Sequence, residues 1–276
     1  MNREIFLSYA RENREAVAQL GRALEESGYH AVWDRDLGGA LPWESQLERK
    51  LAKCDCVVVL WSRDSVESEW VRQESLWAAE RSVYLAVLID GTPPPESLAP
   101  VHAIDFARWN GDRQAHEFEH LVDGIENMFM THRGVDLIES AVKNMARSFE
   151  GVDLAALANA AEAGDADAQW MLGEGQMHGL GGLAESVDSA LPWLMLAAEQ
   201  GHLDAAQALG LYHFLFIENS SASFAVPWFE LAAELGDGYS AWMLSGIYGH
   251  GFGDVRKNLL LGRQFERRYV ELGYRD

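Results

Sequence analysis

An internal repeat in the second half of the chain constrains the fold more than any other feature. The pattern Ala-Ala-Glu-x-Gly occurs at 160–164, 197–201 and 232–236, and a degenerate copy follows at 269–273. Its glycines, at positions 164, 201, 236 and 273, are 37, 35 and 37 residues apart. Two further markers keep this phase: a leucine followed by a small residue (Leu172, Leu209, Leu244) and an aromatic series (Trp193, Trp228, Phe265). A period of this length predicts helical hairpins, stacked as an α-solenoid of about three units over residues 151–276.

The first half of the chain has a different pattern. Short apolar runs lie at 5–7, 31–33, 56–61 and 83–89, with a weaker run at 103–106. Because successive positions are apolar, both faces of each strand must be covered, as in a parallel sheet between helices. Amphipathic helical patterns at 13–27, 43–53 and 67–81 separate the runs. Residues 1–130 are therefore predicted to form a flavodoxin-like, doubly wound α/β domain with a five-stranded parallel sheet, followed by a helical linker over 131–150.

In a doubly wound sheet, ligands bind beyond the carboxyl ends of the strands. The loops at 8–13, 34–42 and 62–68 are consequently the candidate site. The formal net charge of −21 repels phosphate backbones and anionic lipid surfaces, which argues against nucleic-acid and membrane partners. No apolar stretch approaches the length of a membrane span, and the first residues lack the apolar region of a signal peptide. The two cysteines, Cys54 and Cys56, are too close to link distant segments, so we expect a reduced, cytoplasmic protein.

The repeat segments resemble a known family. AQWMLG, HGLGG and ALPWLMLAAEQG in the first unit, and AWMLSGIYGHGFGDVRKN in the third, are similar to Sel-one-like repeats, which are short relatives of tetratricopeptide repeats. The resemblance implies a scaffold or peptide-binding role without chemistry of its own, and thus an unknown ligand or protein partner. The second repeat differs from the first and third repeats. Its residues 214–219 read FLFIEN, whereas the other two repeats have glycines at the corresponding positions. This segment is either a lengthened, buried helix or an apolar docking patch.

The first domain also resembles a known family. EIFLSYAR at 4–11, YHAVWDRD at 29–36, the strand at 57–62 and SEWVRQE at 68–74 are similar, in this order, to the first strand, BB loop, third strand and αC helix of TIR (Toll/interleukin-1 receptor-like) domains. The resemblance implies one of two activities. TIR domains either assemble signalling complexes or cleave NAD⁺ to nicotinamide and an ADP-ribose product, which is sometimes cyclic.

Trp70 and Glu74 favour the NAD⁺-cleaving group. Their i, i+4 spacing puts both side chains on one face of a helix. The resemblance assigns Glu74 the place of the catalytic glutamate in a W-x-x-x-E motif, with Trp70 beside the substrate. A carboxylate suits this chemistry because it stabilises the positive charge that develops on the ribose when nicotinamide leaves. The alternative is that Glu74 is one more solvated carboxylate on a helix surface.

The resemblance implies three more substrate-binding residues. Trp43 would stack against the nucleotide, although it could instead anchor the second helix in the core. Tyr9 and Arg11 would line the pocket, with Arg11 near the pyrophosphate; a solvated loop position is the alternative for Arg11. No cofactor is expected, since NAD⁺ is the substrate. No metal is expected either: HEFEH at 116–120 matches the zinc-binding pattern HExxH, but it lacks a third ligand at a recognised spacing.

Two functions remain open from the sequence. The first is an NAD⁺ nucleosidase that is activated by self-association of its TIR domains, regulated by the repeats and engaged in bacterial immune signalling. The second is a non-catalytic adaptor or effector in which both domains bind proteins. The intact Trp70, Glu74 and Trp43 favour the first.

Overall fold

The computed structural model describes residues 4–33, 51, 54–98, 103–216 and 221–275. Contacts between Cα atoms divide the chain into two compact units, Met1–Phe129 and Met130–Asp276. Two of the segments predicted from the sequence, the loop at 34–42 and most of the helix at 43–53, lie outside the described residues, as does Trp43.

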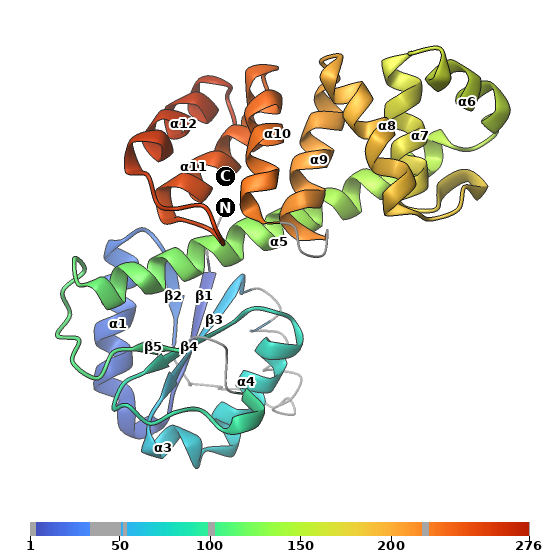
Figure 1. Ribbon diagram of the computed structural model, residues 1–276. Coiled ribbons are helices and arrows are strands. Elements are labelled where there is room, and N and C mark those ends of the chain that lie inside the picture. The colour runs from blue at the N-terminus through green and yellow to red at the C-terminus, as the bar shows by residue number, and fades with distance from the viewer. Residues whose placement is uncertain (1–3, 34–50, 52–53, 99–102, 217–220, 276) are drawn as a thin grey trace. The chain divides into compact units, whose positions relative to one another are not determined.

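The first unit contains a five-stranded parallel sheet with the strand order β2-β1-β3-β4-β5 (Figure 1). This is the doubly wound sheet predicted from the sequence, and all five apolar runs are confirmed as strands. Its strands are β1 (Glu4–Ser8), β2 (His30–Val32), β3 (Cys56–Trp61), β4 (Tyr84–Leu88) and β5 (Ile104–Asp105). Its described helices are η1 (Arg11–Asn13), α1 (Arg14–Glu26), α3 (Arg63–Val66), α4 (Glu69–Glu80) and η2 (Glu96–Leu98), and the unit ends within α5 (His116–Ser148).

Alternate strand residues enter two separate cores, one on each face of the sheet. Residues Ile5, Leu7, Val58 and Leu60 pack with apolar side chains of α1 and α5. Phe6, Val57, Val59 and Trp61 pack on the other face with α4. All six residues of β3 are buried. Burial on both faces is the physical reason why these strands are apolar at every position rather than at every second one.

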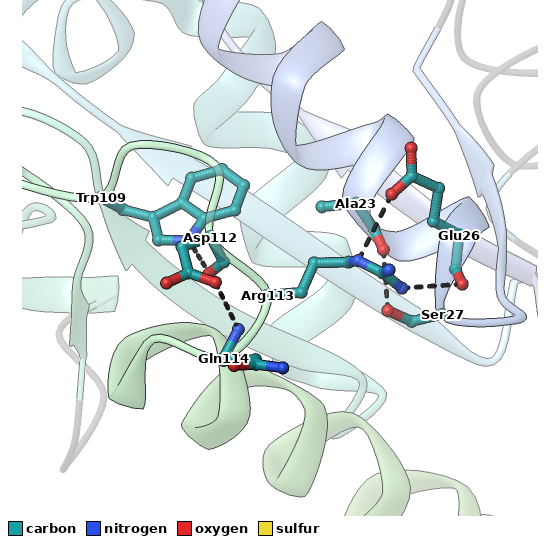
Figure 2. A network of polar contacts seen from close by, with 7 residues as sticks. All are labelled: Ala23, Glu26, Ser27, Trp109, Asp112, Arg113 and Gln114. Atoms are coloured by element: carbon teal, nitrogen blue, oxygen red, sulfur yellow. Dashed lines mark hydrogen bonds and ion pairs between the residues drawn. The ribbon is translucent and has the colours of Figure 1, made fainter.

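The loop that precedes α5 is fixed to the end of α1, as Figure 2 shows. Arg113 donates a hydrogen bond from Nη1 to the Glu26 carbonyl at 2.9 Å, and its Nε lies 3.3 Å from Oε2 of the same residue. Within the loop, Trp109 Nε1 donates to the Asp112 carbonyl at 2.8 Å. The Arg113 and Glu26 side chains are largely exposed, so their ion pair stabilises the fold only slightly. The contact thus mainly orients the loop.

The second unit is built of paired helices. It contains the rest of α5, from Met130 to Ser148. The helices that follow are α6 (Leu154–Glu162), α7 (Ala166–Met177), η3 (Leu180–Gly182), α8 (Val187–Glu199), α9 (Leu203–Leu215), α10 (Ala222–Glu234), α11 (Gly238–His250) and α12 (Leu259–Glu271). The most extensive packing joins α7 with α8, α9 with α10 and α11 with α12. The predicted α-solenoid of about three hairpins is therefore confirmed, with α6 preceding the first hairpin.

The repeated glycines have two structural roles. The second helix of each hairpin is followed by a glycine with a positive φ, a region that residues other than glycine rarely adopt. These are Gly201, Gly236 and Gly273, with φ of +85°, +106° and +73°. Gly210 instead lies inside α9, where a Cβ atom would come within 2.5 Å of the Phe229 ring on α10. The small residue that follows the leucine in this repeated marker therefore permits α9 and α10 to pack closely.

Residues 131–150 were expected from the sequence to form a helical linker, and residues 131–148 continue α5. Their apolar side chains pack against the repeats: Ile138 belongs to the same core as α9 and α11, and Met145 packs with α6 and α7. Gly134 lies close to Leu211 and Leu215 of α9. No helix in the described part of the chain combines the length and apolar character needed to cross a bilayer.

The atypical second hairpin is not lengthened within the described residues. Its helix α9 has 13 residues, as does α11 in the third hairpin. Phe214 packs against Phe252 at 4.3 Å between ring centroids, whereas Phe216 is 55% exposed. The expectation of a lengthened, buried helix therefore does not describe residues 214–216, and positions 217–219 lie outside the described residues.

Substituting Gly210 tests the role of the close approach. We expect Gly210→Ala to destabilise the second unit by about 1–3 kcal/mol, because the new methyl group overlaps the Phe229 ring, which is fully buried. Gly249→Ala in α11 is the matched control, since a Cβ atom there meets nothing within 4 Å. Alanine favours a helix over glycine by about 1 kcal/mol, so the control is expected to be neutral or stabilising. Thermal unfolding distinguishes the two variants, and equal melting temperatures would contradict the packing argument.

Candidate active site

The candidate site lies where β1 and β3 end. The strand order changes direction between these two neighbours, because β1 connects to β2 on one side and β3 leads to β4 and β5 on the other. A hydrogen bond joins the two following loops: Ser62 donates from Oγ to the Asn13 side-chain oxygen at 2.7 Å. Ser62 also caps the N-terminus of α3. Ligands of doubly wound sheets bind at such a position.

Helix α4 presents the W-x-x-x-E pair to this edge. Its N-terminus is capped by the Ser68 side chain, which accepts from the backbone N–H of Val71. The next two turns carry Trp70 and Glu74 on one face, and Trp70 Nε1 donates to Glu74 Oε1. Val71 and Ala78, on the adjoining face, are fully buried against the sheet. The helix packing therefore fixes where the Glu74 carboxylate lies.

The Glu74 side chain is buried and hydrogen-bonded. Only 1% of its surface is exposed. Ser8, the last residue of β1, donates from Oγ to Glu74 Oε2 at 2.5 Å, so each carboxylate oxygen has a donor. The interpretation of Glu74 as a solvated helix carboxylate is therefore wrong. Both contacts stabilise the ionised form, and they also tie α4 to the end of β1.

Chemically, this arrangement is a carboxyl group held in a fixed position at the ligand-binding edge of the sheet. A carboxylate held by two donors does not need to reorganise when a positive charge develops beside it. Among the described residues, no group of three His, Cys, Asp or Glu side chains is placed to hold a metal ion. The rings of His116 and His120 stack on α5 with centroids 6.0 Å apart.

The other sequence-predicted site residues differ in their surroundings. Tyr9, directly after β1, is 5% exposed and belongs to the core on the α1 and α5 face. Arg11 begins η1 and is exposed. Thus Ser8 ends β1, Tyr9 and Arg11 follow it, and Glu74 reaches this strand end from α4. Trp43 lies outside the described residues.

Neither Ser8 nor Ser62 was predicted as a site residue from the sequence pattern. Ser8 opens the loop at 8–13 that the strand pattern places at the site, and Ser62 opens the loop at 62–68. A serine at the end of an otherwise apolar strand is the signal that could have drawn attention to both. However, Ser8 lies 66 residues from its hydrogen-bond partner Glu74, and Ser62 lies 49 residues from Asn13. No local pattern specifies pairs so far apart in the sequence.

Comparison with known families decides the identity of the first unit. Residues 5–122 match the TIR domain family. This segment is a TIR domain. The matched residues include α4, the loops that follow β1 and β3, and all of the sheet except Glu4. The resemblance of the FLSYA and WVRQE segments is thereby confirmed.

Solved structures provide two further similarities. A Sel-one repeat protein from Oxalobacter formigenes is 31% identical, and the match covers 44% of this chain and 91% of that chain with a TM-score of 0.39. An immunity protein from Pseudomonas aeruginosa is 18% identical, with coverage of 86% and 84% and a TM-score of 0.36. No curated protein matches the chain.

Proposed function

We propose that the TIR domain cleaves NAD⁺ to nicotinamide and ADP-ribose or a cyclic ADP-ribose, with Glu74 as the catalytic carboxylate. The TIR family includes NAD⁺ glycohydrolases. The observation that carries the proposal for this chain is the Glu74 carboxylate, held by Ser8 and Trp70 at the carboxyl end of β1. A cytoplasmic location, where NAD⁺ is abundant, is part of the proposal.

In the proposed reaction, the bond between ribose C1′ and the nicotinamide nitrogen breaks, and its electron pair leaves with nicotinamide as a neutral base. The ribose then carries a positive charge that the Glu74 carboxylate stabilises through space. Water attacks C1′ and loses a proton to solvent, which gives ADP-ribose. Attack by an adenine nitrogen of the same molecule instead gives the cyclic product.

The remaining predicted residues are proposed to position NAD⁺. Arg11 is exposed beside the end of β1, where its guanidinium can pair with the pyrophosphate. We assign Tyr9 to the wall of the same pocket, Trp43 to stacking on the nucleotide and Trp70 to both the pocket and the orientation of Glu74. These roles rest on the TIR family.

Regulation is proposed to act through assembly. TIR domains generally self-associate. If stacked domains share the pocket, activity depends on protein concentration. The repeats would control this self-association when they bind a ligand or partner, and such a switch suits bacterial immune, anti-phage signalling.

An NAD⁺ cleavage assay tests the proposal. Full-length protein and residues 1–130 are incubated with NAD⁺ over a range of protein concentrations, and nicotinamide and ADP-ribose species are quantified by chromatography. We expect release that rises more steeply than the protein concentration, and higher release from residues 1–130 if the repeats restrain the TIR domain. Absence of release from both proteins, even with a crowding agent, would overturn the proposal and favour the adaptor function.

A further inference from the structure

A pocket in the second unit is lined by α5, α7 and α9. It has a volume of about 280 Å³. Ile138 and Met145 of α5, Trp170 of α7 and Leu211 of α9 give it mainly apolar walls. The pocket is open to solvent, so a ligand can enter it without unfolding of the repeats. It is large enough for an organic molecule of several heavy atoms.

The pocket also contains a buried carboxylate. Glu174 of α7 is 4% exposed, and the Tyr212 hydroxyl lies 2.9 Å from its Oε1 and 2.8 Å from its Oε2. A hydroxyl has one proton, so the two carboxylate oxygens share a single donor. Among the described residues, Tyr212 is the sole hydrogen-bond donor to Glu174. The carboxylate thus retains capacity for further donors in a pocket that both residues line.

His178 completes this chain of contacts without supplying a positive charge. Its Nε2 lies 2.8 Å from the Tyr212 oxygen and 3.8 Å from Glu174 Oε2. Burial lowers the pKa of His178, so its ring is neutral at pH 7. Because the Tyr212 proton is given to Glu174, we assign the Nε2 proton to His178, which donates to the Tyr212 oxygen.

The charge of the pocket is entirely negative. Asp204 of α9 is exposed, lines the pocket and acts electrostatically on Glu174. No lysine, arginine or histidine is among the residues that line it. A buried carboxylate is costly to ionise unless a cation or further donors accompany it. The complementary ligand has N–H donors, a positive charge and an apolar body.

We propose that this pocket binds a small organic ammonium ion, with the ammonium group on Glu174 and Asp204 and the apolar part against Ile138, Leu211 and Trp170. The ammonium supplies further donors to the carboxylate, and its positive charge is complementary to the two acidic groups. The proposal concerns the repeats alone and does not depend on NAD⁺ cleavage.

Calorimetric titration of the full-length protein tests this proposal. The probes are n-butylammonium and 2-phenylethylammonium, with 2-phenylethanol as the neutral counterpart of the second. We expect at least one ammonium probe to bind with a Kd below about 1 mM, and 2-phenylethanol to bind at least tenfold more weakly, since hydrogen bonds to charged groups have about this effect.

Matched variants locate the site. Glu174→Gln is expected to weaken ammonium binding at least tenfold. Asp204→Asn is expected to weaken it several-fold, and this position is exposed, so the substitution does not endanger folding. Glu162→Gln replaces an exposed carboxylate of α6 that does not line the pocket, and it is expected to bind as the wild type does. The proposal is overturned if neither ammonium probe binds with a Kd below about 1 mM, or if binding is the same in Glu174→Gln, Asp204→Asn and wild type.

Discussion

Replacement of Glu74 by glutamine is expected to lower the rate of NAD⁺ cleavage at least a hundredfold. Removal of one fixed electrostatic group from a transition state typically costs roughly 100- to 1,000-fold in kcat. Glutamine has nearly the same shape as glutamate, its carbonyl oxygen can accept from Trp70, and its amide can donate to Ser8, so the contacts between α4 and β1 remain. The loss is therefore attributable to the missing charge.

Two further variants make this result interpretable. Glu80→Gln removes an exposed carboxylate from the same helix and is expected to retain full activity. Ser8→Ala removes one donor to Glu74, and we expect a smaller loss of about tenfold, as for one hydrogen bond to a charged group. Initial rates of nicotinamide release, with circular dichroism as a control for folding, provide the measurement. Wild-type activity in Glu74→Gln would exclude a catalytic role for this carboxylate.

The second large effect concerns stability of the repeat unit as pH changes. Burial and the nearby Asp204 raise the pKa of Glu174 from 4.5 to about 7, despite the opposing hydrogen bond from Tyr212. The folded state therefore holds this proton more tightly than the unfolded state does. The resulting stability is fully present below pH 4.5 and is lost as the pH rises through 7. We expect the contribution to be about 3 kcal/mol at most.

Glu174→Gln isolates this contribution. The variant resembles protonated Glu174, so it is expected to match the wild type near pH 4 and to be more stable by about 2–3 kcal/mol at pH 8. Scanning calorimetry from pH 4 to 8 measures the difference, which corresponds to several degrees in Tm for a unit of this size. The groups that act electrostatically on position 174 are the same in wild type and variant: Asp204, Tyr212 and the neutral His178. Parallel pH profiles for wild type and Glu174→Gln would contradict the prediction.

The elements of the fold could be predicted because their signals are local. The run at 56–61 is apolar at every position, which only a strand buried on both faces tolerates, and β3 has those bounds. The glycines at 201, 236 and 273 mark helix ends because each needs a positive φ. These requirements apply to residues a few positions apart, so they can be read along the chain.

The sequence by itself determined a doubly wound sheet, a helical repeat and the strand ends that face a ligand, and it singled out Glu74 through a local W-x-x-x-E spacing. Only the tertiary structure decided what surrounds the buried carboxylates of Glu74 and Glu174. Ser8 reaches Glu74 across 66 residues, and Tyr212 reaches Glu174 across 38. Such pairs depend on how helices and strands pack, and in a chain with 43 acidic residues no periodicity distinguishes a solvated carboxylate from one that packing removes from water.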